Sequence, residues 1–156
     1  DYLRPGRRLY LLSTGTGLAP FMSIVRDPEV YERFEQVVLV HGVRQVAEPA
    51  YRQLLTEELP RPEYLGEMVS AKLRYVPTVT REPFPTMGRI PELIDSGRLA
   101  AMLQLPELAP AEDRVMICGS TAMLRDLKTL LEQRGFEEGN TTRPGDFVIE
   151  RAFVDQ

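Results

Sequence analysis

The chain has 156 residues, of which 43% are hydrophobic, so it is large enough for one globular domain with a substantial core. Its formal net charge of −4 at pH 7 argues against nucleic acid as the main partner, because a phosphate backbone requires a basic surface. The apolar runs are much shorter than a membrane span, and a single cysteine fits a reducing compartment. We therefore expect a cytoplasmic protein that binds neither nucleic acid nor membranes.

Residues 1–8 are polar and contain a Pro-Gly pair, Pro5-Gly6, which is typical of a connecting segment. We expect them to be an interdomain linker that joins the domain at residues 9–156 to a preceding part of a longer protein. A processed N-terminus is the alternative explanation for the first residue, Asp1.

The first strand is predicted at residues 9–12 and leads directly into the turn Ser-Thr-Gly-Thr-Gly-Leu-Ala-Pro at residues 13–20. Glycine allows a sharp turn and leaves no side chain between the backbone amides and a ligand. Pro20 is compatible with the first turn of a helix, where its missing N–H costs nothing. The pattern indicates a phosphate site at a helix N-terminus, although it is neither the six-position Rossmann fingerprint nor a P-loop.

The other predicted strands support a parallel sheet. Continuous apolar runs, which are typical of parallel strands covered on both faces, occur at residues 9–12, 37–40 and 115–118. The run at 73–80 contains Pro77, which cannot donate to a sheet ladder, so it predicts an edge strand or a bulge. A short final strand is predicted at 147–149.

Helices are predicted between these strands, after Pro49, at 91–95, at 99–103 and from Thr121 onward, where Ser120 or Thr121 is the N-cap and Gly135 the C′ residue. The alternation predicts an α/β fold, namely an open, doubly wound, mainly parallel five-stranded sheet with helices on both faces. In such sheets ligands bind at the carboxyl ends of the strands, where the strand order reverses.

Short motifs follow the predicted strands in a fixed order. They are Gly-Thr-Gly-Leu-Ala-Pro at 15–20, His-Gly-Val-Arg at 41–44, Thr-Arg-Glu at 80–82, Gly-Arg-Ile at 88–90, Cys-Gly-Ser at 118–120 and the tail at 150–156. Across essentially the whole chain, this set resembles the NADP-binding domain of bacterial-type ferredoxin–NADP reductases.

The resemblance implies an oxidoreductase that passes hydride between NADPH and FAD, and single electrons between FAD and ferredoxin or flavodoxin. It also implies an N-terminal FAD-binding β-barrel, whose Arg-x-Tyr-Ser/Thr motif is absent from these residues. The chain alone should then bind NADP(H) but neither hold FAD firmly nor turn over.

The resemblance further implies which residues bind the nucleotide. Backbone amides of the first turn would hold the pyrophosphate of NADP, in a subsite made of Thr14, Gly15, Thr16 and Gly17. Arg81 and Arg89 would hold the 2′-phosphate, because a guanidinium forms paired, charge-assisted hydrogen bonds with phosphate. Arg44 is a further candidate for that phosphate or the adenine. For each arginine, a solvated surface residue is the alternative.

At the nicotinamide end, the resemblance places Cys118 beside the hydride-bearing carbon, where a small, soft side chain would shape the pocket. Gly119 and Ser120, in the same turn, are assigned to cofactor binding. Glu150 would lie near the same junction and assist nicotinamide placement or proton movement, unless pairing with Arg151 silences it.

In the tail, Ala152 stands where plastid-type members carry a terminal aromatic residue. Alanine offers too little contact area to compete with nicotinamide for the flavin face. Phe153 and the residues after it would shield the flavin or bind the adenine side of FAD.

Two other interpretations are open. One is an NADH-dependent reductase component of an oxygenase, or a relative of the cytochrome b5 or nitrate reductases, in which two arginines beside the ribose would have no purpose. The other is a non-catalytic nucleotide-binding module, which a flavin-binding barrel upstream in the gene would exclude. We expect no metal site.

Overall fold

The predicted parallel sheet is present in the computed structural model, which describes residues 3–14, 21, 24, 27–43, 73–79, 90–140 and 142–149. Within these residues, five strands form one sheet: β1 (Arg8–Thr14), β2 (Gln36–Val43), β3 (Leu73–Val79), β4 (Asp113–Cys118) and β5 (Phe147–Ile149). Their order is β3-β2-β1-β4-β5, and every neighbouring pair is parallel. The predicted α/β fold class is confirmed.

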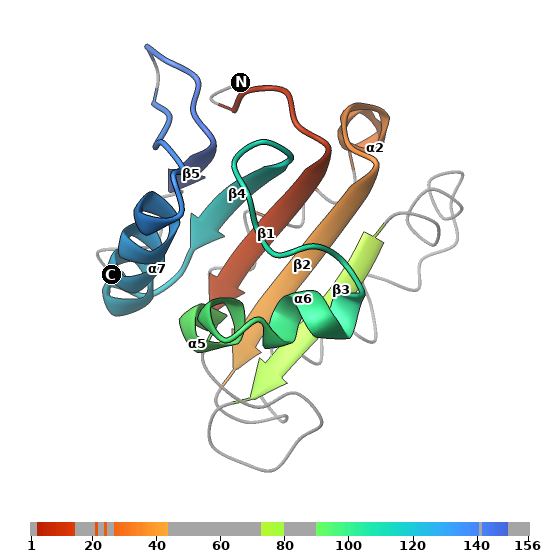
Figure 1. The fold of residues 1–156 in the computed structure, drawn as a ribbon. Coiled ribbons are helices and arrows are strands. Elements are labelled where there is room, and N and C mark those ends of the chain that lie inside the picture. The colour runs from red at the N-terminus through yellow and green to blue at the C-terminus, as the bar shows by residue number, and fades with distance from the viewer. Residues whose placement is uncertain are drawn as a thin grey trace.

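The central strand of this sheet is β1, in which Leu12 pairs with Val40 of β2 and with Ile117 of β4. From β1 the chain moves outward to β2 and β3, and it then returns to the other side of β1 for β4 and β5 (Figure 1). The strand order therefore reverses between β1 and β4. In an open α/β sheet, this switch point is where ligands bind.

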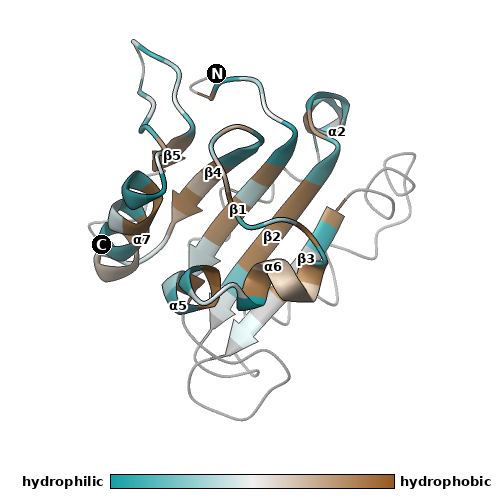
Figure 2. Ribbon diagram, in the orientation of Figure 1, coloured by the Kyte–Doolittle hydropathy of each residue, from teal (hydrophilic) through white to brown (hydrophobic). Residues whose placement is uncertain are grey.

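One face of the sheet is covered by three helices, α5 (Ile90–Asp95), α6 (Arg98–Leu103) and α7 (Thr121–Gln133) (Figure 1). Their apolar residues pack with alternate residues of the central strands, Tyr10, Leu12, Val38, Val40, Val115 and Ile117. Figure 2 shows the apolar colour along these strands, with polar residues at the amino ends of β1 and β4.

The opposite face has its own apolar layer, built around Leu9, Leu11, Val37 and Leu39 of the strands. Tyr31 of α2 (Pro28–Arg33), together with Phe21 and Phe34, covers these side chains. All three aromatic residues are at most 3% exposed. Burial of each large apolar side chain contributes about 1.5–3 kcal/mol, so both layers stabilise the sheet. Helices on both faces, as the sequence predicts, are therefore found.

Helix α7 has the ends that its sequence predicts. The Ser120 hydroxyl oxygen accepts a hydrogen bond from the Met123 amide at 3.3 Å and caps the first turn. Gly135 follows the C-cap residue Arg134 with a φ of 92°, a left-handed conformation that glycine adopts without strain. Helices α5 and α6 each begin one residue before the predicted segments.

Some boundaries differ from the prediction for a physical reason. Strands β1 and β4 begin earlier than their apolar runs, because Arg8 and Asp113 pair within the sheet and can be buried together. Strand β3 lies at the sheet edge, which is compatible with Pro77. Helix α2 has only six residues and was not predicted, although Asp27 caps it and Pro28 begins it. The helix predicted after Pro49 lies outside the described residues.

Among the described residues, no helix has the length and apolarity that crossing a bilayer requires.

Candidate functional site

The candidate site lies at the carboxyl ends of the parallel strands. Of the predicted site residues, the structure describes Thr14, Cys118, Gly119 and Ser120. The others lie outside the described residues, and their roles stay predictions: Gly15, Thr16, Gly17, Arg44, Arg81, Arg89, Glu150, Ala152 and Phe153.

Three described strand ends and one helix start adjoin four of these residues in the sequence. Strand β1 ends directly before Gly15, β2 directly before Arg44 and β5 directly before Glu150, while α5 begins directly after Arg89. Because all five strands are parallel, their carboxyl ends share one edge of the sheet. The order of elements is therefore the one that the predicted site requires.

At the switch point, a hydrogen bond joins the ends of the two central strands. Thr14 is the last residue of β1, and its Oγ1 accepts from the Ser120 amide at 3.3 Å. The preceding pair in the register is Ser13 with Cys118. The last residue of β1, which leads into the predicted pyrophosphate subsite, is thus in direct contact with the Cys-Gly-Ser turn.

Two glycines make this contact possible. A Cβ added to Gly119 would overlap Thr14 Oγ1 and would lie 2.8 Å from Met123 Cε. A Cβ added to Gly42 of β2 would lie 3.2 Å from Thr14 Cγ2. The Thr14 side chain therefore packs between Gly42 and Gly119, neither of which has a side chain. Gly42 was not predicted as a site residue, although a glycine inside a strand is a signal of close backbone approach.

Ser120 connects this contact to helix α7. Its backbone amide donates to Thr14, and its hydroxyl caps the first turn of the helix. The first turn contains no acidic residue, so no carboxylate of its own offsets the positive end of the helix dipole. Ser120 itself is exposed, whereas Gly119 is buried. This end of α7 is electrostatically suited to an anionic or electron-rich ligand group.

Cys118 ends strand β4, one strand from the centre of the sheet, as the sequence predicts. It is fully buried and packs in the apolar layer that contains Leu9, Leu11 and Phe21. In this conformation Cys118 is a packing residue, and its placement beside a nicotinamide stays a prediction. Ser13, its register partner, is equally buried, and its hydroxyl donates to the Val40 carbonyl oxygen at 3.3 Å.

No group of three or more histidine, cysteine, aspartate or glutamate residues within the described ranges is arranged to hold a metal ion. The polar atoms at the switch point belong instead to backbone amides and hydroxyl groups, which suit phosphate and sugar groups.

Comparison with known proteins assigns the family. Residues 11–129 match the family model for the oxidoreductase NAD-binding domain. Over 99% of its length the chain is 59% identical to ferredoxin–NADP reductase A of Sorangium cellulosum and covers 55% of that protein. It is 56% identical to ferredoxin–NADP reductase of Azotobacter vinelandii, of which it covers 60%.

A solved structure is similar to the whole fold. The chain superposes on a ferredoxin NADP⁺ reductase of Neisseria gonorrhoeae, determined with bound FAD and NADP, with a TM-score of 0.79 and 31% identity. The match covers 96% of this chain and 57% of that one. The chain thus spans little more than half the length of these relatives, and the resemblance that its motifs indicated is confirmed. The chain belongs to the family of oxidoreductase NAD-binding domains.

Proposed function

We propose that this chain is the NADP(H)-binding domain of a flavin-dependent ferredoxin– or flavodoxin–NADP reductase. In this proposal an FAD-binding β-barrel precedes the domain in the complete protein, and the predicted linker, shortened to residues 1–7 because Arg8 begins β1, lies between the two parts. The chain alone binds NADP(H) but does not turn over, because the flavin is held mainly by the preceding domain.

The observation that carries this proposal is the contact between Thr14 and the Cys-Gly-Ser turn at the switch point of the sheet. A dinucleotide is long enough to need two adjacent binding turns, and here the strand end that leads into the first turn contacts the second. The absence of a side chain at Gly119 allows this contact, because a Cβ there would overlap Thr14 Oγ1. The similarity to proteins named ferredoxin–NADP reductases supports the same function.

In the proposed mechanism this chain positions the nucleotide. When bound, NADPH and FAD supply the redox chemistry, a hydride passing between them. Backbone amides of residues 15–17 hold the pyrophosphate, and Arg81 and Arg89 bind the 2′-phosphate with charge-assisted hydrogen bonds. Arg44 contributes to the same phosphate or to the adenine side.

The nicotinamide end is formed by the turn that Thr14 holds in place. Cys118, Gly119 and Ser120 limit the space beside the ring, and Glu150 assists its placement. Ala152 would be too small to compete with nicotinamide for the flavin face, and Phe153 and the residues after it would shield the flavin or bind the adenine side of FAD. The electron-transfer partner is ferredoxin or flavodoxin, and the enzyme works in the cytoplasm.

The full-length protein tests this function. Its flavin should be bleached rapidly by NADPH and slowly by NADH under anaerobic conditions, and the reduced enzyme should pass single electrons to ferredoxin or flavodoxin. Flavin reduction that is faster with NADH would favour the reductase component of an oxygenase. A full-length protein that contains no flavin would favour the non-catalytic nucleotide-binding module.

A further inference from the structure

A second polar cluster lies at the amino ends of the strands, opposite the candidate site. Its centre is Arg114, the second residue of β4, which is 6% exposed. The guanidinium donates hydrogen bonds to four backbone carbonyl oxygens, those of Arg4 (3.1 Å), Pro5 (2.6 Å), Pro110 (2.7 Å) and Asp113 (2.6 Å). It also lies 3.5 Å from the Asp146 carboxylate.

This arrangement fixes the chain before β1. Burial of a guanidinium costs several kcal/mol unless its N–H groups are partnered. Two of the four carbonyl acceptors belong to Arg4 and Pro5, in the segment that leads into the domain. Burial of Arg114 therefore depends on the position of that segment. Because the guanidinium is a rigid planar fork, its bonds determine the direction of that segment as well as its position.

A second set of contacts, made by Arg4 itself, holds the same segment. The Arg4 side chain donates to Asp146 at 3.1 Å and to Glu137 at 2.6 Å, and its amide donates to the Gly145 carbonyl oxygen at 2.9 Å. Figure 1 shows the N-terminal segment running beside the loop before β5. Residues that the sequence predicts as part of a linker are thus hydrogen-bonded to the domain.

Gly6 completes the enclosure of Arg114. A Cβ added to Gly6 would lie 2.7 Å from Arg114 Cγ and 3.1 Å from its Nε. Cγ is close to the backbone, so it cannot move away as the end of a long side chain would. A single methyl group at position 6 would therefore displace the arginine from its carbonyl partners.

We propose that Arg114 is a positioning residue for hydride transfer. By fixing the direction in which the chain enters this domain, it fixes how the FAD-binding part is placed against the site at the carboxyl ends of the strands. The proposal rests on the proposed reductase function. The polar cluster lies at the amino ends of the strands, and the proposal gives it a role in the chemistry at their carboxyl ends.

The geometry explains why a small change at this cluster matters. The seven residues of β1 separate the cluster from the candidate site by roughly 23 Å, so a tilt of about 5° at one end displaces the other by about 2 Å. Reacting atoms must lie within about 3–3.5 Å of each other, and a misplacement of about 1 Å can lower a rate by about a hundredfold. The proposed pyrophosphate and 2′-phosphate contacts all come from this domain, so we expect nucleotide affinity not to depend on that orientation.

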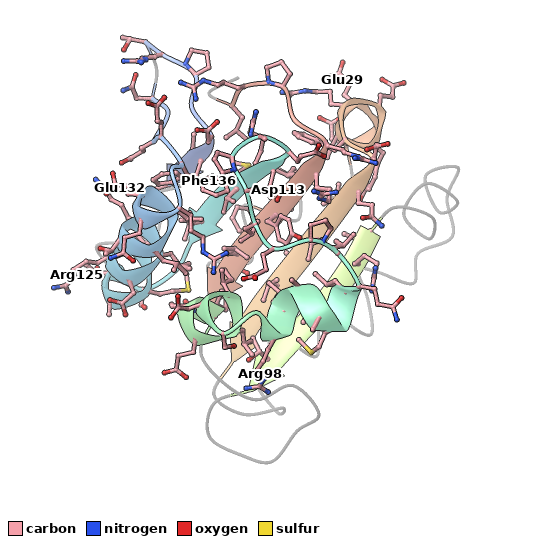
Figure 3. All side chains as sticks on the ribbon, viewed as in Figure 1. Glu29, Arg98, Asp113, Arg125, Glu132 and Phe136 are labelled. Atoms are coloured by element: carbon pink, nitrogen blue, oxygen red, sulfur yellow. The ribbon has the colours of Figure 1, made fainter. Side chains whose placement is uncertain are left out.

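The test uses the full-length, FAD-containing protein with Arg114→Met and Gly6→Ala. We expect both variants to reduce the rate of flavin reduction by NADPH, and kcat with it, by about 10- to 100-fold. The Kd for NADP⁺ should stay at the wild-type value. Arg125→Met is the matched control, because Arg125 is exposed on the outer side of α7 (Figure 3), and it should leave both quantities unchanged.

Each result decides the proposal. Wild-type rates of flavin reduction in Gly6→Ala or in a folded Arg114→Met would overturn it, as would an equal loss of NADP⁺ affinity and rate. If Arg114→Met does not fold, Gly6→Ala decides. Arg114→Lys should be as slow as Arg114→Met, since a lysine cannot form the forked set of bonds, and a wild-type rate would overturn the proposal. Failure of the wild-type protein to oxidise NADPH would instead refute the proposed function.

Discussion

Gly119→Ala places a methyl group in the contact between the carboxyl ends of β1 and β4. The added carbon would overlap Thr14 Oγ1 and would lie 3.1 Å from the Thr14 amide nitrogen. The backbone nitrogen belongs to a central strand and cannot move alone, so the clash has to be relieved by separating the end of β1 from the Cys-Gly-Ser turn. Overpacking of this kind costs about 1–3 kcal/mol in the free energy of unfolding.

The size of the effect is measurable in this chain. A loss of about 2 kcal/mol should lower Tm by roughly 4–8 °C for a domain of this length. Urea unfolding followed by circular dichroism gives the free energy directly. Gly42→Ala is the matched control, because its Cβ would be 3.2 Å from a methyl group, Thr14 Cγ2, and it should cost less than Gly119→Ala.

A double-mutant cycle with Thr14→Ala separates the clash from other effects. Thr14→Ala alone loses the hydrogen bond from the Ser120 amide, at a cost of about 1 kcal/mol. In the double variant the added methyl group no longer meets Oγ1, so the combined cost should be smaller than the sum by about 1 kcal/mol. Strict additivity, or a Gly119→Ala variant as stable as the wild type, would refute the tight contact at the switch point.

Three further outcomes follow from the described contacts. Asp113→Asn removes the buried carboxylate 2.7 Å from Arg8 and leaves Arg8 with the longer, 3.7 Å contact to the more exposed Glu112, so it should lower the free energy of unfolding in urea by about 3–5 kcal/mol; a cost below about 1 kcal/mol, as for an exposed pair, would contradict this. Ser120→Ala removes the cap of α7 and should cost about 1 kcal/mol, with Ser120→Asp restoring most of it in the same assay. Burial raises the pKa of Tyr10 and Tyr31 to about 12 each, so their contribution to stability is complete below the unfolded pKa of about 10 and is lost as pH rises toward 12. In a pH titration, the tyrosinate absorbance of the folded protein should therefore rise at higher pH than that of the unfolded chain. Coincident titration curves would contradict the burial.

The sheet could be predicted from the sequence because its strands are buried on both faces. Continuous apolar runs located β2 and the interior parts of β1 and β4, and Pro77 placed β3 at the edge. Helix α7 was predictable at both ends because its capping signals are local, within a few residues of each end. Helix α2 was missed because six residues provide too little periodicity to detect.

The polar clusters were less predictable because their partners are distant in the chain. Arg114 and Arg4 are 110 residues apart, and Arg8 and Asp113 are 105 apart, so no local pattern indicates that either pair is in contact. At the site, the motifs indicated Thr14 and the Cys-Gly-Ser turn individually. Their hydrogen bond, and the role of Gly42 beside it, became visible only when the strand order placed β1 between β2 and β4.

The central claim is that this domain binds a dinucleotide that carries a 2′-phosphate. Its most direct test is calorimetric titration of the full-length protein with NADP⁺ and NAD⁺, repeated with Arg81→Ala and Arg89→Ala. Arg143→Ala is the control, because Arg143 is exposed in the loop before β5, at the other edge of the sheet. We expect NADP⁺ to bind at least about tenfold more tightly than NAD⁺, with each arginine variant losing much of that preference and the control retaining it. Equal affinity for both nucleotides, unchanged by either arginine substitution, would contradict the account.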